Sequence, residues 1–321
     1  MEKPIMNTKV IEKDQQTINE QAFYKGNIDK RLLEGFRTSN FMKYKIKQGV
    51  SLLTSWLNKG EYYPKKQERV NQLKQLDIEK LVEKVLLTTI YCFRDELLVS
   101  VAVQLVSVLK FDDKPDGVKT AAELLGVLCQ TDLYDVNKDT RDRLTIISKI
   151  EIESSLKYEM GLAMNMPPMV CKPKSIKNNH TSGYLTFNDS VVLGKDNNHG
   201  GNLCLEVLDS LNKTPLNLNL EFLKQVNEEI DEEKIKQKIS EAKTRKEVRK
   251  LENQLYNWEE FREQSKQVYL LLAKQGNKFY MTHKVDMRGR IYAQGYHVNY
   301  QGMSYKKSSI ELANKEIVSG L

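Results

Sequence analysis

The chain has 321 residues, 40% of them hydrophobic and 29% charged, which suffices for one large or two ordinary globular domains. Lysine and arginine exceed aspartate and glutamate by 50 to 43, a formal net charge of +7 that permits a polyanionic partner without requiring one. The opening residues MEKPIMNTKVIEKD contain no apolar stretch, which argues against export and membrane insertion and favours the cytoplasm. The four cysteines show no CxxC spacing, which favours reduced thiols.

Residues 18–160 predict one helix after another, because apolar residues recur at three and four positions and glycine and proline are few. We expect the helix in YKIKQGVSLLTSWLNKG to stop near Gly60, and Asp77 to cap the helix in IEKLVEKVLLTTIYCF. A third helix is expected in DGVKTAAELLGVLCQTDL. The apolar run at 97–109 is too short to cross a bilayer as a helix and predicts a core helix. This half is expected to be all-α.

Composition changes at residues 164–201, where three of the seven prolines gather with asparagines and glycines. This stretch predicts a long loop. Within it, YLTF and SVVL are separated by Asn188-Asp189 and predict a short β-hairpin.

Helices are expected again in LCLEVLDSLNKTPLNLNLEFLKQVNEEI, interrupted near Pro215, and through the charge-dense segment 231–274. Apolar residues in that segment follow three-four spacing and predict one buried stripe on a long helical hairpin; they are Val248, Leu251, Leu255 and Trp258. From Lys278 the apolar period shortens towards two in KFYMT and RIYAQGYHV, which predicts strands. The expected fold class is mainly α with a C-terminal α+β part.

The stretch KVDMRGRIYAQG carries the first candidate site. Arg288 and Arg290 offer N–H donors in planar forks on either side of Gly289, which lets the backbone approach a ligand closely. Such a group suits phosphates. Asp286 would hold one guanidinium in place, and Tyr292 would stack on or hydrogen-bond to a sugar. The alternative is an ordinary turn between strands, with an Asp–Arg ion pair and surface arginines.

A second candidate is the segment VCKPKSIKNNH, in which Lys172, Lys174 and Lys177 stand without an intervening acid. Such a loop can follow a nucleic-acid backbone, each phosphate contact making the affinity salt-dependent. The alternative is a solvated loop, because lysines are mostly exposed.

Residues with zinc-ligand chemistry occur at Cys171, His180, His199 and Cys204. Their spacings of 8, 18 and 4 intervening residues match no usual zinc finger or ribbon, so no metal site is expected. No phosphate-binding glycine loop, GxSxG elbow or HExxH motif occurs either, and no complete catalytic centre is evident.

Several of these segments, in this order, resemble the single-subunit DNA-directed RNA polymerases of bacteriophages and mitochondria. KVDMRGRIYAQG is similar to the family's DxxGR motif at the start of the palm, and YQGMSYKKSSIELANKEIV to its continuation. MPPMVCKPKSIKNNHTSGY resembles the proline-rich loop that ends in Gly-Tyr, and LNKTPLNLNLEFLKQVNE the segment leading into the thumb. The resemblance covers about residues 160–321 well and the helical half weakly.

The resemblance implies four regions. Residues 1–163 would be a helical N-terminal domain, and 164–215 a loop and hairpin region containing proline and glycine. Residues 216–277 would form the helical thumb, and 278–321 the start of the palm with the DxxGR motif. The chain departs from the family at Met287, where an aromatic residue is common.

By the same resemblance, Arg288 and Arg290 would hold the template strand and the RNA–DNA hybrid near the active centre. Asp286, Gly289 and Tyr292 would belong to that binding site. Lys172 and Lys174 would join it from the proline-rich loop, in which Lys174-Ser175 stands where Pro-Trp is common in the family.

The family's two metal-binding aspartates, its fingers helix and its specificity loop follow at positions beyond Leu321. We therefore expect no catalytic residue and no metal in this chain, and Mg²⁺ bound by a partner chain in a heterodimer. Template DNA, nascent RNA and a DNA-binding recruiting factor are the other implied partners, without a membrane, in the cytoplasm of the infected bacterial host. Two alternatives stay open: a truncated piece of a one-chain polymerase, and a helical nucleic-acid-binding regulatory protein.

Overall fold

The computed structural model describes residues 8–60, 62–109, 111, 113–139, 142–163, 165–194, 201–225 and 232–315. Helices make up 58% and strands 10%, so the expected mainly α class with a C-terminal α+β part is confirmed at that level. Contacts divide the chain into two compact units, residues 26–157 and residues 1–25 with 158–321, and the predicted region 1–163 therefore contains residues of both. None of the described helices is long and apolar enough to span a membrane.

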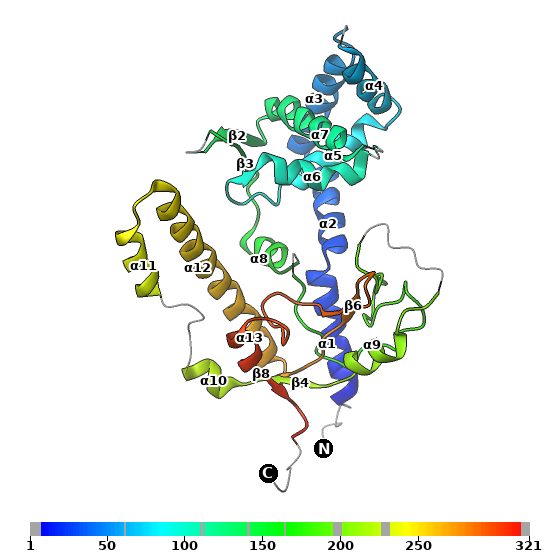
Figure 1. Cartoon of the computed structure of the whole chain (residues 1–321). Coiled ribbons are helices and arrows are strands. Elements are labelled where there is room, and N and C mark those ends of the chain that lie inside the picture. Colours follow the sequence, from blue (N-terminus) through cyan, green and yellow to red (C-terminus); the bar gives the residue numbers. More distant parts are fainter. Residues whose placement is uncertain are drawn as a thin grey trace. The chain divides into compact units, whose positions relative to one another are not determined.

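The unit at 26–157 is built mainly from helices (Figure 1). They are α2 (Lys25–Thr38), α3 (Asn40–Leu57), α4 (Pro64–Leu73), α5 (Ile78–Thr89), α6 (Leu98–Leu109) and α7 (Lys114–Leu128), followed by the short 3-10 helix η1 (Cys129–Thr131). The Asp77 side chain accepts a hydrogen bond from the backbone N–H of Lys80 at 3.1 Å, which confirms the predicted cap of α5. α3 ends at Leu57, and Gly60 follows with a φ of +98°, close to the predicted stop.

The predicted core helix at 97–109 is confirmed as α6, which has two contrasting faces. Val101 and Leu105 are each 1% exposed in the core of the unit. Val99 and Val103, on the other face, are 61% and 54% exposed. The apolar run therefore buries one side only.

The expectation that this half is all-α is wrong. Three strands, β1 (Glu96–Leu97), β2 (Tyr134–Lys138) and β3 (Leu144–Ser148), form an antiparallel sheet in the order β1-β3-β2. β3 has the sequence LTIIS, whose β-branched residues fit a pleated surface, but five residues are too few for a period to stand out. Tyr134 anchors the sheet, because its buried hydroxyl donates to the carbonyl oxygen of Leu125 at 2.6 Å.

The second unit combines helices with short strands. Its elements are α1 (Thr8–Phe23), α8 (Ser154–Ala163, which begins in the other unit), α9 (Leu205–Asn212), β4 (Leu216–Leu218), α10 (Leu220–Gln225), α11 (Glu232–Glu241), α12 (Arg245–Lys274), β5 (Lys278–Phe279), β6 (His283–Val285), β7 (Ile291–Ala293), α13 (Ser304–Ser308) and β8 (Ile310–Leu312). One antiparallel sheet has the order β5-β4-β8, and β6 pairs with β7 as a hairpin. The strands predicted after Lys278 are therefore present but short, and β4 lies in a segment predicted to be helical.

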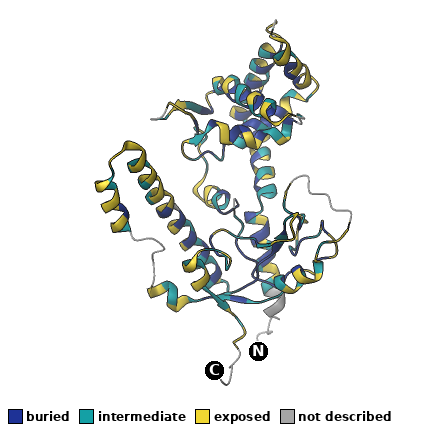
Figure 2. Ribbon diagram, in the orientation of Figure 1, coloured by how far each residue is buried: buried dark blue, intermediate teal, exposed yellow. Residues whose placement is uncertain are grey.

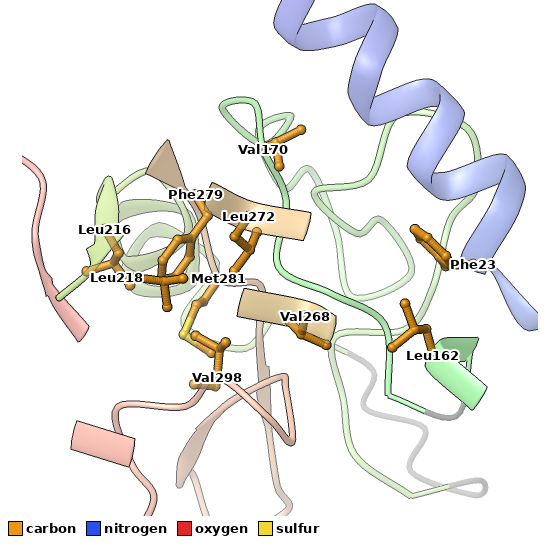
Figure 3. Packing of buried hydrophobic residues seen from close by; sticks show 11 residues of the cluster. Phe23, Leu162, Val170, Leu216, Leu218, Val268, Leu272, Phe279, Met281 and Val298 are labelled. Atoms are coloured by element: carbon orange, nitrogen blue, oxygen red, sulfur yellow. The ribbon is translucent and has the colours of Figure 1, made fainter. Parts of the chain in front are cut away.

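A hydrophobic core joins these strands to the helices around them. Figure 3 shows Leu272, Phe279 and Met281 lying together, and all three are at most 1% exposed. The cluster consists of Phe23, Leu162, Val170, Leu216, Leu218, Val268, Leu272, Phe279, Met281, Ala293 and Val298. Because α12 and β5 both contribute, the base of the long helix is fixed to the sheet.

The long helical hairpin predicted at 231–274 is confirmed by α11 and α12, which lie side by side (Figure 1). α12 begins with a capping box, in which Thr244 and Glu247 each accept the other's backbone N–H. Most residues along the hairpin are exposed or partly exposed (Figure 2). Within the predicted stripe only Trp258 is buried, while Val248, Leu251 and Leu255 are partly buried.

The described residues of 164–201 contain no helix or strand, as the composition predicts, but the hairpin predicted in YLTF and SVVL is wrong. Phe187 stacks between Tyr24 and Tyr184, with ring centroids 3.8 and 4.5 Å away. Val192 forms a parallel bridge with Val285 of β6. YLTF and SVVL therefore do not pair with each other. Phe187 of the first and Val192 of the second contact residues elsewhere in the unit.

Candidate nucleic-acid site at the turn between β6 and β7

The residues of the DxxGR-like motif form the turn of the β6–β7 hairpin. Val285 pairs with Ile291, so residues 286–290 make the connection. The backbone N–H of Asp286 donates to the carbonyl of Arg290 at 2.9 Å, and that of Gly289 to the carbonyl of Asp286 at 2.9 Å. Gly289 has a φ of +77°, which favours glycine at this position.

The Asp286 carboxylate organises the turn. One oxygen accepts the backbone N–H groups of Arg288 and Arg290, each at 2.9 Å. The other accepts Nε of Arg290 at 2.7 Å and the hydroxyl of Tyr292 at 3.2 Å. The hydrogen bonds from Arg290, followed by those from Arg288 and Tyr292, hold the pKa of this carboxyl well below its usual range. Asp286 is therefore ionised at neutral pH.

The side chains of Arg288 and Arg290 differ in how firmly neighbouring residues hold them in place. Nη2 of Arg290 lies 2.7 Å from the Asp286 carboxylate, and its guanidinium carbon lies 5.7 Å from the centre of the Tyr292 ring. The Arg288 side chain is 75% exposed, and its Nε approaches the same carboxylate only to 3.8 Å. Arg290 therefore fixes the turn, while Arg288 presents most of its N–H donors to solvent.

The alternative prediction for this motif is an ordinary turn with an Asp–Arg ion pair and surface arginines. It describes the geometry of residues 286–290 correctly. The connection from β2 to β3 has the sequence DTRDR, and the residues described within it, Asp139, Asp142 and Arg143, form the same pattern of backbone hydrogen bonds. There the carboxylate of Asp139 accepts the backbone N–H of Arg143 at 3.0 Å and two guanidinium nitrogens at 2.9 and 2.7 Å. The Asp–Arg arrangement by itself is therefore a structural device.

The two connections differ in their balance of acidic and basic residues. DTRDR has as many acids as bases, and its second acid, Asp142, lies 2.7 Å from Nζ of Lys138. DMRGR has one acid and two bases, with Gly289 at the place of Asp142. The turn at 286–290 thus offers net positive charge on a rigid support, and it suits an anion such as a phosphate.

The long loop braces the hairpin that carries this turn. Backbone hydrogen bonds of 2.8 Å join Val285 to Val191 and to Leu193. Lys284 forms an ion pair of 2.6 Å with Asp189. A small core lies beneath, formed by Ile176, Val191, Val192, Leu208 and Val285. Residues 189–193, which follow the proline-rich loop, therefore hold β6 in place next to the turn.

The predicted lysines of the loop do not join the turn. Lys174 donates its ammonium to the carbonyl of Leu185 at 2.6 Å. Lys172 and Lys177 are exposed. Within the part of the chain that the structure describes, none of the three hydrogen-bonds or ion-pairs with residues of the turn at 286–290. They remain surface cations of the loop.

No protein-family model matches this chain, and no curated protein matches it either. Sequence similarity therefore does not identify a family, and the resemblance of DMRGR to a polymerase motif stays a prediction. The geometry of the turn is the basis for a functional proposal.

The residues with zinc-ligand chemistry are not gathered into one group. Cys171 is buried, and burial raises the pKa of its thiol to about 11. His180 and Cys204 are exposed, and His199 lies outside the described residues. Among described residues, no three His, Cys, Asp or Glu side chains are placed to hold a metal ion.

A buried histidine that the sequence reasoning did not single out supports the hairpin. His283 of β6 is 2% exposed, with Nδ1 lying 2.8 Å from Oδ1 of Asn212 and Nε2 2.6 Å from the hydroxyl of Tyr300. Burial lowers the pKa of this imidazole to about 4, so it is neutral at pH 7. Alternation with Val285 is the signal that could have placed His283 on the inner face, but nothing in the sequence points to Asn212.

Gln301 is a second residue that the sequence reasoning missed. Its side-chain oxygen accepts the backbone N–H of Ala293 at 2.8 Å, and its amide nitrogen donates to the carbonyl of Ile291 at 3.0 Å. The side chain therefore takes the place of a neighbouring strand along β7. It satisfies backbone groups at the edge of the hairpin, which limits fraying next to the turn.

Proposed function

We propose that this chain is a subunit of a DNA-directed RNA polymerase of the single-subunit type, in which it holds template DNA and the RNA–DNA hybrid. The observation that carries the proposal is the cationic turn at 286–290. It combines the DMRGR sequence with a carboxylate that fixes Arg290 and leaves Arg288 exposed.

The chemistry of the turn suits a nucleic-acid backbone. A guanidinium binds phosphate oxygens with two parallel N–H donors, and a rigid support reduces the entropy lost on binding. Arg288 is the residue with donors to offer, since Arg290 is engaged by Asp286. Tyr292 is half-buried against Arg290 and Asp286, so in this proposal it orients the turn.

The remaining elements have roles in the same proposal. The α11–α12 hairpin would act as the thumb and the β6–β7 hairpin as the first part of the palm. A second chain would supply the aspartates that bind Mg²⁺, and this chain would be inactive alone. Two-metal chemistry activates the attacking hydroxyl and stabilises the leaving pyrophosphate.

The test begins with the tagged chain, expressed together with its genomic neighbours and purified. Mass spectrometry identifies whatever is recovered in stoichiometric amount, and RNA synthesis is measured on a single-stranded template. We expect a partner with the aspartate motifs, and a loss of synthesis of about tenfold or more for Arg288→Ala with assembly intact. Arg141→Ala, at the position of DTRDR that corresponds to Arg288 in DMRGR, is the matched control and is expected to keep synthesis.

Other outcomes would decide for the alternatives. A chain that is recovered alone, binds DNA through Arg288 and leaves RNA synthesis unchanged would be a regulatory nucleic-acid-binding protein. A reading frame that continues past Leu321 into the aspartate motifs would make it a piece of a one-chain polymerase.

A further inference from the structure

An open groove is lined by residues of α10, of the C-terminal half of α12 and of the start of α13. The three helices are labelled in Figure 1. The volume of the groove is about 580 Å³. Leu220, Leu223 and Lys224 of α10 form one side, and Tyr305 of α13 closes one end. The other wall comes from α12 and consists of Trp258, Phe261, Arg262, Glu263, Ser265, Lys266, Tyr269, Leu270 and Ala273.

The groove exposes aliphatic surface to solvent. Leu270 is 51% exposed and Leu220 38% exposed, and Leu223 is partly buried between them and the rest of the lining. Apolar surface gathered in one concave place is the usual mark of a binding site for another molecule. Trp258 and Phe261 in the same lining are only 6% and 7% exposed, so they present no open ring face on which a nucleobase could stack, and the exposed leucines favour a protein segment over a nucleic acid.

Three of the lining residues, Trp258, Phe261 and Tyr305, are aromatic and contact one another. Trp258 and Phe261 stack with centroids 5.6 Å apart, and Tyr305 meets Trp258 edge-on at 6.3 Å. Trp258 is 6% exposed, and its indole N–H has no acceptor among the described residues.

Charges on the lining favour an acidic occupant. Arg262 forms an ion pair of 3.0 Å with Glu232. In the described part of the chain, Lys224 and Lys266 have no ion pair, and Glu263 is the one acid among the lining residues. The lysines of the lining that have no ion pair with a described residue thus outnumber its one acid.

We propose that this groove binds an amphipathic helix of the second polymerase chain, with apolar side chains in the groove and Asp or Glu flanking them. The inference rests on the proposed function for the identity of the partner. Apolar anchors of such a helix would recur at three and four positions, the spacing that fills a groove of this kind. Lys224 and Lys266 would pair with its acids.

The test places a photo-crosslinking amino acid at Leu270 in the co-expressed complex. We expect the crosslink to join this chain to a single peptide of the second chain, with leucine or phenylalanine on one face and acids beside them. A crosslink to nucleic acid, to a second copy of this chain or to its own residues would overturn the inference, and so would the absence of any crosslink in an assembled complex.

Substitutions give an independent measurement. Leu270→Asp and Lys266→Glu are each expected to weaken retention of the second chain by about tenfold or more, since the first buries a charge and the second reverses one. Val103→Asp is the matched control, because Val103 is a similarly exposed apolar residue on a helix of the other unit. Circular dichroism of each isolated chain checks that the fold is kept.

The results separate this inference from the proposed function. If Leu270→Asp assembles normally while Arg288→Ala still abolishes RNA synthesis, the groove inference is wrong and the polymerase proposal stands. If no second chain is recovered and no synthesis is detected, both are wrong.

Discussion

The carboxylate of Asp286 holds both the backbone N–H and the guanidinium of Arg290, at 2.9 and 2.7 Å. This pair turns a short hairpin connection into a rigid support for the neighbouring Arg288, which is 75% exposed. One arginine therefore serves the structure and the other is available to a ligand. The first prediction follows from this division of roles.

Under the proposed function, Arg288→Ala is expected to weaken binding of single-stranded DNA by the co-purified protein, without altering the hairpin. Removing one phosphate contact lowers the slope of log affinity against log salt by about one, and the loss is similar for all template sequences. Fluorescence anisotropy with a labelled strand, repeated at several salt concentrations, measures both quantities. An unchanged slope would mean that Arg288 makes no phosphate contact.

We expect Asp286 to stay ionised, and its hydrogen bonds in the turn to persist, at a lower pH than is usual for an aspartate. Hydrogen bonds, those from Arg290 first, hold the pKa of Asp286 below its usual range, so the unfolded chain takes up this proton at a higher pH than the folded chain does. The stabilisation is fully present above about pH 4, the ordinary range of an aspartate, and is lost as pH falls through the folded pKa. An NMR titration of the Asp286 carboxyl carbon should show a midpoint below that of an exposed aspartate. A midpoint near 4 would contradict the hydrogen-bond geometry.

Asp286→Asn tests the same arrangement at neutral pH. The amide keeps an oxygen acceptor but loses the charge that orients Arg290 and Tyr292, so the turn is expected to loosen while the rest of the unit stays folded. Hydrogen exchange at the amide nitrogens of Arg288 and Arg290 should speed up. Asp139→Asn, in the turn between β2 and β3, should produce the same local effect there and leave nucleic-acid binding unchanged.

Two buried histidines make the stability of the protein depend on pH in a second way. Their pKa values are shifted by burial, whereas that of Asp286 is shifted by hydrogen bonds to its charged form. Burial lowers the pKa values of His283 and His297 to about 4, against about 6.5 in an unfolded chain. The unfolded state therefore binds more protons as pH falls below about 6.5, and stability drops progressively until about pH 4. Each histidine accounts for a loss on the order of 3 kcal/mol across that window. Urea unfolding at pH 7 and pH 5 measures the part of this loss that occurs above pH 5.

The matched variants for this dependence are His283→Gln and His297→Gln. Glutamine does not titrate, so each variant should be less stable at pH 7 yet lose less stability between pH 7 and pH 5 than the parent chain. His283 has two hydrogen-bond partners, whereas Nε2 of His297 has none among the described residues. His283→Gln should therefore cost more at pH 7. Equal pH dependence in all three proteins would exclude both histidines as its source.

Local signals in the sequence were enough for the helices and for the turn. Asp77 and Gly60 mark helix ends because capping and positive φ depend on a few neighbouring atoms. DMRGR predicts a turn with an Asp–Arg pair for the same reason. Asp286 and Arg290 therefore pair as this local reasoning expects, whereas Lys172 and Lys174 do not join them, and the function of the turn stays a proposal.

Pairings between distant segments were not predictable in the same way. The apolar residues of YLTF and SVVL suggest a hairpin, but Phe187 is better covered by Tyr24, and Val192 by Val285. Likewise Asn212 meets His283 across 71 positions, a contact set by tertiary packing. A single sequence shows which segments are apolar, but it does not show which distant segments pack against one another. Short strands such as β3 were missed because their period is too brief to detect.

A pair of helix glycines tests the packing of the N-terminal unit. A Cβ atom added at Gly49 in α3 would lie 2.9 Å from Cγ1 of Val82 and 3.3 Å from Cδ2 of Leu128, side chains of two neighbouring helices. Gly49→Ala is expected to destabilise the unit by about 1–3 kcal/mol, because the overlap must be relieved within a packed core. At Gly126 in α7 an added Cβ meets nothing within 4 Å.

Gly126→Ala is accordingly the control and should stabilise the protein by up to about 1 kcal/mol, since alanine loses less backbone entropy on entering a helix. Thermal unfolding of both variants beside the parent chain gives the two signs directly. If Gly49→Ala proves as favourable as Gly126→Ala, then α3 does not approach α5 and α7 as closely as the structure places it. Opposite signs would support the close packing of α3 against α5 and α7.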